Sequence, residues 1–285
     1  MSKIKATKWK STQFMTSHDF EINFYRDKDL RTVSMHSHDF YELYFFMQGS
    51  VGYIVENGHY KLEAGDILLI SPTNLHQMDI SGTPVYERIV LWLNTKYLFQ
   101  LSTQNTDLSL CFKISSKHKN HLLRDPILAE TLKSYLLNLY TLSKSDKYGD
   151  DISCEIYIKA ILLNLSKYLK SAKYENTEIE SNDIVRKVTD FVNAHLNQSL
   201  NLDMLAKEVF ISKYYLAHLF KEETGITLYQ YIIKKRLILS KRYIEQKLPI
   251  TEVYSKCGFT DYSNFFRAFK QEYDITPKQY FKLIS

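Results

Sequence analysis

Three histidines and a glutamate in the first third of the chain have the types and spacing of a metal-binding or hydrogen-bonding group. His36 and His38 are two residues apart, and Glu42 follows His38 by four residues. Alternate residues of a β-strand point to the same face, so these side chains can converge within a β-domain. Together with His76 they would supply three imidazoles and one carboxylate, a set that suits iron, manganese, nickel or zinc. We favour two other roles for them, hydrogen bonds that fix the mouth of a barrel and direct contacts to a small ligand.

Polar residues near the end of the chain have the chemistry to read DNA bases. Arg267 can pair bidentately with guanine and Asn264 with adenine, although Arg267 could instead clamp a phosphate. An earlier group is weaker, because Ala217 offers only a methyl group and Tyr214 only an aromatic edge and one hydroxyl. The residues that we expect to contact DNA are Lys213, Tyr214, Ala217, His218, Tyr262, Ser263, Asn264 and Arg267.

These two groups belong to a segment that occurs twice. Matching residues are 49 positions apart throughout, as in the pairs Phe210 and Phe259, Phe220 and Phe269, and Thr227 and Thr276. One fixed spacing indicates that a single structural unit has been used twice. In each copy, apolar residues recur at three- and four-residue steps on both sides of a short break, which predicts two helices joined by a tight turn. Such a pair is a helix-turn-helix, or else a helical hairpin stacked only for stability.

Capping residues mark the start of the second helix in each copy. Ser212 and Asp261 can each accept a hydrogen bond from the first helical turn, and Gly258 suits a left-handed turn just before Asp261. A longer helix over residues 228–246 would join the two copies, and Pro249 would end it. The residues that we expect to face inward are Leu216, Leu219, Phe220, Phe265, Ala268 and Phe269, together with Tyr215.

The net positive charge of the chain comes entirely from the part that contains the repeated segment. Residues 183–285 contain 16 Lys and Arg against 11 Asp and Glu, a net charge of +5 that equals the net charge of the whole chain. The first 182 residues are therefore neutral. A positive excess confined to one segment favours contact with phosphate, and so favours DNA binding over stacked hairpins.

The last hundred residues resemble the AraC/XylS family of transcription regulators. The residues that carry the resemblance are Leu205–Val209, Ser212, Leu216, Leu219–Gly225, Gly258–Asp261, Phe265, Phe269, Lys270, Thr276, Pro277 and Tyr280. The resemblance implies two recognition helices that enter successive major grooves about 34 Å apart. It also implies a homodimer that binds double-stranded DNA, and usually an activator, which would require contact with RNA polymerase. Asp274 departs from the glycine that most members have, but Asp tolerates the left-handed conformation.

The first hundred residues show a different pattern, of short β-branched and aromatic segments separated by glycines. These segments cover residues 41–47, 51–55, 66–70 and 86–93, and they predict an antiparallel β-barrel or sandwich. The spacing of His36, His38, Glu42 and Gly49, with His76 further on, resembles the cupin superfamily over residues 20–93. Thr73 departs from that pattern, because metal-binding cupins usually have glycine at this place.

We prefer an effector pocket inside the barrel, because a barrel of this size can enclose one small molecule. Aromatic rings beside charged groups suit a small polar metabolite such as a sugar, and packing of Tyr44 and Trp92 in a closed core is the alternative. The candidate lining residues are Tyr25, Arg31, His38, Glu42, Tyr44, His76, Arg88 and Trp92. We expect no cofactor and no bound metal; were a metal present, its ligands would be His36, His38, Glu42 and His76.

The expected fold is α+β with two domains. We place a cupin-like antiparallel β-barrel sensor domain at residues 1–105, a helical linker or dimerisation segment at 106–172, a polar linker at 173–182, and an all-α DNA-binding domain with two helix-turn-helix motifs at 183–285. Two amphipathic helices are expected over residues 125–143 and 151–172. They would either form the contact of a homodimer or pack back on their own barrel.

Three functions remain open from the sequence alone. The preferred one is a ligand-responsive transcription factor, with no enzyme activity and no catalytic residue. The alternatives are a metal-dependent cupin enzyme fused to a DNA-binding module, and a dimeric regulator that binds no ligand. No membrane span and no leader are expected. Cys111, Cys154 and Cys257 are too far apart to indicate a disulfide framework, which fits the cytoplasm.

Overall fold

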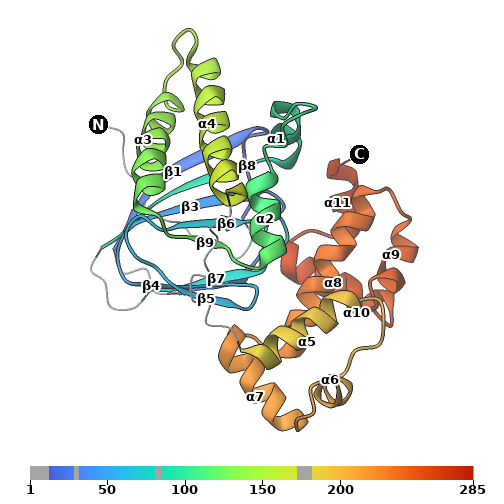
Figure 1. Cartoon of the computed structure of the whole chain (residues 1–285). Helices are drawn as coiled ribbons and strands as arrows, with labels where there is room; N and C mark the ends of the chain where they lie inside the picture. The colour runs from blue at the N-terminus through green and yellow to red at the C-terminus, as the bar shows by residue number, and fades with distance from the viewer. Residues whose placement is uncertain (1–12, 29–31, 81–84, 172–181, 285) are drawn as a thin grey trace. The chain divides into compact units, whose positions relative to one another are not determined.

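The chain divides into two compact units, Met1–Glu180 and Ser181–Ser285. The computed structural model describes residues 13–28, 32–80, 85–171 and 182–284. The first unit combines strands with helices and the second contains helices, as Figure 1 shows. The prediction of a two-domain α+β fold is therefore confirmed. In the described part of the chain, no helix is long and apolar enough to cross a membrane.

The strands of the first unit form two antiparallel sheets. A five-stranded sheet has the order β1-β8-β3-β6-β9, and a four-stranded sheet has the order β2-β7-β4-β5. The hydrogen bonds between described strands thus follow two antiparallel sheets, in agreement with the antiparallel β-domain, a barrel or a sandwich, that the sequence predicted. The strands are Phe20–Asp27 (β1), Thr32–His36 (β2), Tyr41–Gln48 (β3), Val51–Val55 (β4), Gly58–Lys61 (β5), Ile67–Ile70 (β6), His76–Ile80 (β7), Tyr86–Leu93 (β8) and Leu122–Leu123 (β9).

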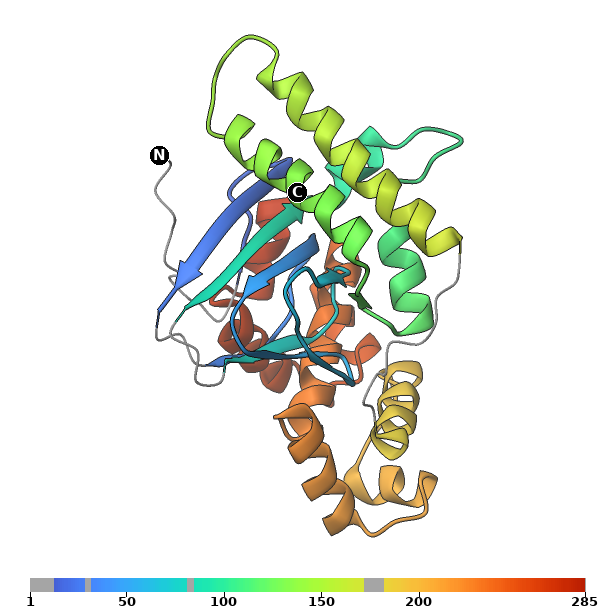
Figure 2. The same ribbon diagram turned by 60° about the vertical axis from the view of Figure 1, so that its left-hand side comes forward.

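The two sheets and a set of helices form three layers. In both views of Figures 1 and 2, α3 and α4 cover the face of the five-stranded sheet that points away from the other sheet. Strand β3 shows why: Leu43 and Phe45 pack with the helices, whereas Tyr44 and Phe46 pack between the sheets. This alternation follows from the two-residue period of a strand. The helices are Thr95–Leu101 (α1), Leu110–His118 (α2), Pro126–Leu142 (α3) and Asp150–Lys170 (α4).

The helices α3 and α4 bury most of their apolar residues against their own unit. Ile158, Ile161 and Leu165 of α4 share one buried cluster with residues of α3 and of the five-stranded sheet. Packing on the same chain, one of the two alternatives for these helices, is therefore observed. Two isoleucines of α4 remain on the surface, since Ile152 is 57% exposed and Ile156 is 60% exposed.

The second unit contains two helix-turn-helix pairs joined by one long helix. The pairs are α6 with α7 and α9 with α10, and α8 connects them as expected. The helices are Asp183–Ala194 (α5), Leu202–Glu208 (α6), Lys213–Thr224 (α7), Leu228–Glu245 (α8), Ile250–Lys256 (α9), Tyr262–Tyr273 (α10) and Pro277–Ile284 (α11).

Local hydrogen bonds explain where the repeated helices begin and end. The side chain of Ser212 accepts a hydrogen bond from the backbone of Tyr215, and that of Asp261 accepts one from Asn264. The left-handed residue that ends α7 is Gly225, whereas Asp274 ends α10 with a φ of 57°. The departure at Asp274 therefore leaves the fold intact, because Asp tolerates this conformation better than most residues.

Arg236, in the middle of α8, ties several parts of the second unit together. Its guanidinium donates to the carbonyl oxygens of Leu196 and Gln198, at 3.0 and 2.6 Å. Gly258, in the turn between α9 and α10, lies against the same groups: a Cβ there would be 2.2 Å from the oxygen of Leu196 and 2.9 Å from Arg236. The loop before α6, the centre of α8 and the second turn thus meet at one point.

Candidate DNA-reading surface and candidate effector site

The outer face of α7 carries the first group of predicted DNA contacts. Tyr214 is 79% exposed and His218 is also exposed, while Ala217 is half-buried. Lys213 pairs with Asp203 at 2.9 Å, and His218 lies 3.5 Å from Glu222. An approaching phosphate would therefore compete with the carboxylate of Asp203 for the Lys213 ammonium.

The assignment of Tyr215 to the core is wrong, because its side chain is 53% exposed. Leu216, Leu219 and Phe220 already fill the inner face of α7, and Tyr215 lies beside that face. Phe210, just before α7, is 94% exposed and has a φ of 57°. From the sequence we used Phe210 only to align the two copies and gave it no role at the surface, although an apolar residue outside the helical period was a usable signal.

Three polar side chains are connected along the first turns of α10. Asp261 accepts hydrogen bonds from both the backbone and the side-chain amide of Asn264. The amide oxygen of Asn264 in turn accepts from Nη2 of Arg267, at 2.7 Å. Tyr262 and Ser263 are exposed on the same helix, whereas Phe265 and Phe269 are buried. The two expected base-reading residues are therefore held in a fixed relation to each other and to the helix cap.

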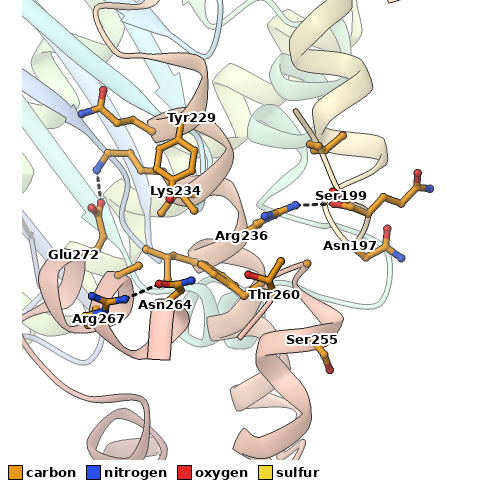
Figure 3. Close-up of a pocket in the computed structure, with 18 of the residues that line it drawn as sticks. Asn197, Ser199, Tyr229, Lys234, Arg236, Ser255, Thr260, Asn264, Arg267 and Glu272 are labelled. Atoms are coloured by element: carbon orange, nitrogen blue, oxygen red, sulfur yellow. Dashed lines mark hydrogen bonds and ion pairs between the residues drawn. The ribbon is translucent and has the colours of Figure 1, made fainter. Parts of the chain in front are cut away.

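A pocket of about 940 Å³ lies next to these residues within the second unit. Figure 3 shows Asn264 and Arg267 on one wall, Tyr229 and Lys234 of α8 on another, and Asn197 and Ser199 from the loop before α6. Lys234 pairs with Glu272 of α10, which fixes α8 against α10. The base-reading candidates thus border a concave surface.

The predicted effector residues gather between the two sheets of the first unit. The register pairs Glu42 with Trp92 on β3 and β8, so both side chains enter the space between the sheets. Tyr44 and Arg88 share that face, because each lies an even number of residues from the first pair. A cavity of only about 40 Å³ remains here, lined by Gln13, Tyr25, His36, Glu42, Tyr44, Tyr53, Met78, Arg88, Val90 and Trp92.

Arg88 and a tyrosine pair form the polar end of this space. Arg88 pairs with Asp27 at 2.6 Å, and its guanidinium lies over the rings of Tyr25 and Tyr86, at 4.6 and 4.2 Å from their centroids. The hydroxyls of Tyr44 and Tyr86 are hydrogen-bonded to each other. Burial raises the pKa of Tyr86 to about 12, so both hydroxyls stay protonated and act as hydrogen-bonding groups.

The histidines and Glu42 form the other end. Nε2 of His38 lies 3.1 Å from Oε2 of Glu42, and Nε1 of Trp92 donates to the same oxygen at 2.9 Å. Burial acts to raise the pKa of Glu42, but the hydrogen bond from His38, electrostatic interaction with the two histidines and the hydrogen bond from Trp92 outweigh it, so this pKa is lowered. Burial, followed by repulsion from His38, lowers the pKa of His76 to about 4, so its imidazole is neutral at pH 7.

Five of the eight candidate effector residues line this cavity, and His38 and His76 lie next to Glu42; Arg31 lies outside the described residues. Four residues were named as ligands should a metal be present. The ligand atoms of three of them, His38, Glu42 and His76, all lie within 4.8 Å of one another. His36 lies beside His76, with ring centroids 4.0 Å apart, but outside that group. Sequence reasoning missed Asp27 on β1, Tyr53 on β4 and Tyr86 on β8; of these strands, only β4 carries none of the predicted residues.

Comparisons with known proteins agree with both halves of this description. An AraC-like ligand binding domain matches residues 18–165, and a helix-turn-helix domain matches residues 205–283. The first match alone covers more than half of the chain. The chain therefore belongs to the AraC family of transcriptional regulators, and it is a regulator rather than an enzyme, with a ligand-binding domain and a helix-turn-helix DNA-binding domain.

Two relatives and one solved structure illustrate the range of similarity. The regulatory protein SoxS of Salmonella typhimurium is 33% identical over 98 residues, which are 34% of this chain and 92% of SoxS. The transcriptional activator RhaS of Escherichia coli is 18% identical over 244 residues, 85% of each chain. The crystal structure of ToxT from Vibrio cholerae covers 94% of this chain and 99% of ToxT at 14% identity, with a TM-score of 0.40.

Proposed function

We propose that this chain activates transcription by placing α7 and α10 in successive major grooves of one operator. The supporting observation is the link from Asp261 through Asn264 to Arg267, which presents two base-reading groups together on an exposed helix. The second copy then supplies hydrogen-bonded base readout. The first copy, with Tyr214, Ala217 and His218, mainly positions the protein on the DNA.

Separate mutation of the two helices tests this division. We would select preferred DNA sequences from a random pool, first with the intact chain and then with alanine at Tyr214 and His218, or at Asn264 and Arg267. The α10 variant should lose sequence preference, while the α7 variant should lose affinity for all sequences alike. Equal loss of preference in both would refute the division, and no preference in the intact chain would refute sequence-specific binding. A reporter gene behind the selected site distinguishes activation from repression.

We further propose that a small polar metabolite, a sugar being one class that fits, binds between the sheets of the first unit. The charged and aromatic groups there support this proposal, as does Oε1 of Gln13, which is buried and has no hydrogen-bond partner among the described residues. Pockets for drug-sized ligands usually measure about 300–1,000 Å³. A cavity of about 40 Å³ means that side chains must move to admit an effector, which provides a route for signalling.

Thermal-shift screening of the full chain with sugars and related polar metabolites tests the effector proposal. A ligand present at about 100 times its Kd stabilises the folded state by about 2.7 kcal/mol. The shift should shrink in Gln13→Leu and persist in Phe14→Ala, whose side chain is exposed on the neighbouring residue. If no compound of this class shifts the melting temperature, a regulator that binds no polar effector becomes the better account.

The remaining assignments rest on the same family-level reasoning. We propose that residues 1–105 sense the effector, that 106–172 mediate dimerisation, that 173–182 connect the parts, and that 183–285 bind DNA. The exposed Ile152 and Ile156, on one face of α4, support a homodimer contact there. The active complex would contact RNA polymerase in the cytoplasm.

A further inference from the structure

Three buried side chains in the first unit converge as metal ligands do. His38, Glu42 and His76 are each more than nine-tenths buried, and their ligand atoms lie within 4.8 Å of one another. Nε2 of His38 and Oε2 of Glu42 are 3.1 Å apart. Two ligands of one zinc-sized ion, each about 2.0–2.2 Å from it, are separated by roughly 3–3.5 Å. These two atoms are therefore already spaced as two ligands of one ion, which would replace the proton between them, and only His76 has to approach.

His76 provides an independent reason to expect a ligand. Its Nδ1 lies 3.0 Å from the carbonyl oxygen of Asn74, to which it donates. The proton is thus on Nδ1, and Nε2 carries a lone pair. Among the residues that the structure describes, this Nε2 is a buried side-chain atom without a hydrogen-bond partner. An unpaired buried acceptor costs about 1–3 kcal/mol, so something that it can bind would remove the cost.

The surrounding groups hold the ligand atoms in the orientation that an ion needs. Nδ1 of His38 lies 2.9 Å from the carbonyl oxygen of Phe40, and the Phe40 ring stacks on the imidazole at 3.9 Å. Trp92 fixes Glu42 by its indole N–H. Metal-binding residues are usually held by such hydrogen bonds. In each histidine the nitrogen that would not bind the metal faces a backbone carbonyl, and the carboxylate accepts from a donor.

A small cavity next to the three ligands has room for water on a bound ion. About 40 Å³ is open beside Glu42, which exceeds the roughly 10–15 Å³ needed for one water molecule. Glu42 lines this cavity and His38 and His76 do not, so the ion itself would lie between the three ligand atoms, at the edge of the cavity.

We propose that this unit binds one divalent first-row transition-metal ion through Nε2 of His38, the carboxylate of Glu42 and Nε2 of His76, with the remaining positions held by water. His36 lies beside the site and is not assigned a coordinating position. This reverses our expectation from sequence, which did not include the orphaned nitrogen of His76. The ion would hold β3 and β7, which belong to different sheets, and this role requires neither a catalytic step nor a particular effector.

Metal binding by the full chain, stripped with a chelator, tests the proposal. We would titrate Co²⁺ and follow its visible absorption, titrate Zn²⁺ by calorimetry, and record the melting temperature with each ion. The intact chain should bind one ion per chain and melt at a higher temperature. Glu42→Gln and His76→Gln should each weaken binding at least about 100-fold, and Trp92→Phe, which removes the supporting donor together with part of the ring that packs on Phe40, about 10- to 100-fold.

His118→Gln is the matched control, because His118 is exposed on α2, and it should bind as the intact chain does. Circular dichroism shows which variants fold; Glu42→Gln is nearly isosteric and decides the question if His76→Gln does not fold. The proposal is wrong if the intact chain binds neither ion. It is equally wrong if folded Glu42→Gln keeps full affinity, which would assign the binding to surface histidines.

Discussion

Asp261 has two contacts at the start of α10, and they can be separated by mutation. One carboxylate oxygen caps the helix by accepting from the backbone N–H of Asn264, and the other accepts from the Asn264 side chain. Ser212, at the matching place in the first copy, caps α7 by its hydroxyl. Asp261→Ser would therefore give the second copy the cap of the first and remove only the link to Asn264.

We expect Asp261→Ser to keep stability within about 0.5 kcal/mol, because Asp and Ser cap helices about equally well. The preference for specific over random DNA should fall by about 0.5–1.5 kcal/mol, the net contribution of one hydrogen bond. Chemical denaturation and competitive DNA binding measure the two quantities. Unchanged preference would show that Asn264 does not depend on Asp261 for its orientation.

Arg267→Ala should cost about 1–3 kcal/mol of specific binding and relax the choice of base at one position. The physical reason is the loss of a bidentate donor that no neighbour on α10 replaces. Lys270→Ala, which removes another exposed cation from the same helix, serves as the control and should affect all DNA sequences alike. Quantitative footprinting on operator variants would decide; an Arg267→Ala protein with equal losses on every sequence would assign Arg267 to a phosphate.

The sequence predicted most of the side chains that gather between the two sheets, but not how those side chains contact one another. Glu42, Tyr44 and Trp92 enter the inter-sheet space because strands have a period of two, and this could be worked out in advance. The orphaned nitrogen of His76 depends on the packing of β7 against β2 and β4, which no local pattern specifies. Tyr215 is an example on a helix. Whether its side chain is buried depends on which neighbouring residues already fill the core, and the sequence does not show this.

At the scale of elements, the turn before α10 is more constrained than any other glycine turn described. Gly258 has a φ of +82°, and a Cβ at this residue would overlap the carbonyl oxygen of Leu196. We expect Gly258→Ala to destabilise the second unit by more than the roughly 1–3 kcal/mol that a left-handed conformation costs a residue with a side chain. Gly149→Ala is the matched control, because Gly149 has a φ of +84° and nothing within 4 Å of the added Cβ. Thermal unfolding of both variants measures the difference, and equal losses would mean that the contact at Leu196 relaxes freely.

Long capped helices were predicted to within a few residues, whereas several short elements were not predicted. α8 was expected over residues 228–246 and covers Leu228–Glu245, since its apolar period and capping box are both in the sequence. α1 has only seven residues with two of them buried, and β9 has only two residues. Such elements lack enough periods to be recognised, and the place of β9 is set by its pairing with β6 at the edge of the five-stranded sheet.

At the scale of the whole molecule, the homodimer that we propose depends on the exposed face of α4. Ile156→Glu should dissociate a dimer, because it would bury a charge in an apolar contact without a partner. Phe99→Glu, on an α1 residue that is 82% exposed, is the control and should leave the mass unchanged. Light scattering at micromolar concentration gives the mass of each. An intact chain that is a strict monomer would contradict the dimer, and a dimer unaffected by Ile156→Glu would place its contact elsewhere.

The junction at Arg236 has a consequence for the DNA rather than for the protein. Because the loop before α6, the centre of α8 and the turn at Gly258 are joined there, the two helix-turn-helix pairs cannot turn independently. One base pair inserted between the two contacted grooves rotates one of them by about 35° around the duplex axis, since a turn takes about 10–10.5 base pairs. The operator should therefore tolerate base changes between its two contacted segments far better than a change in their helical phase.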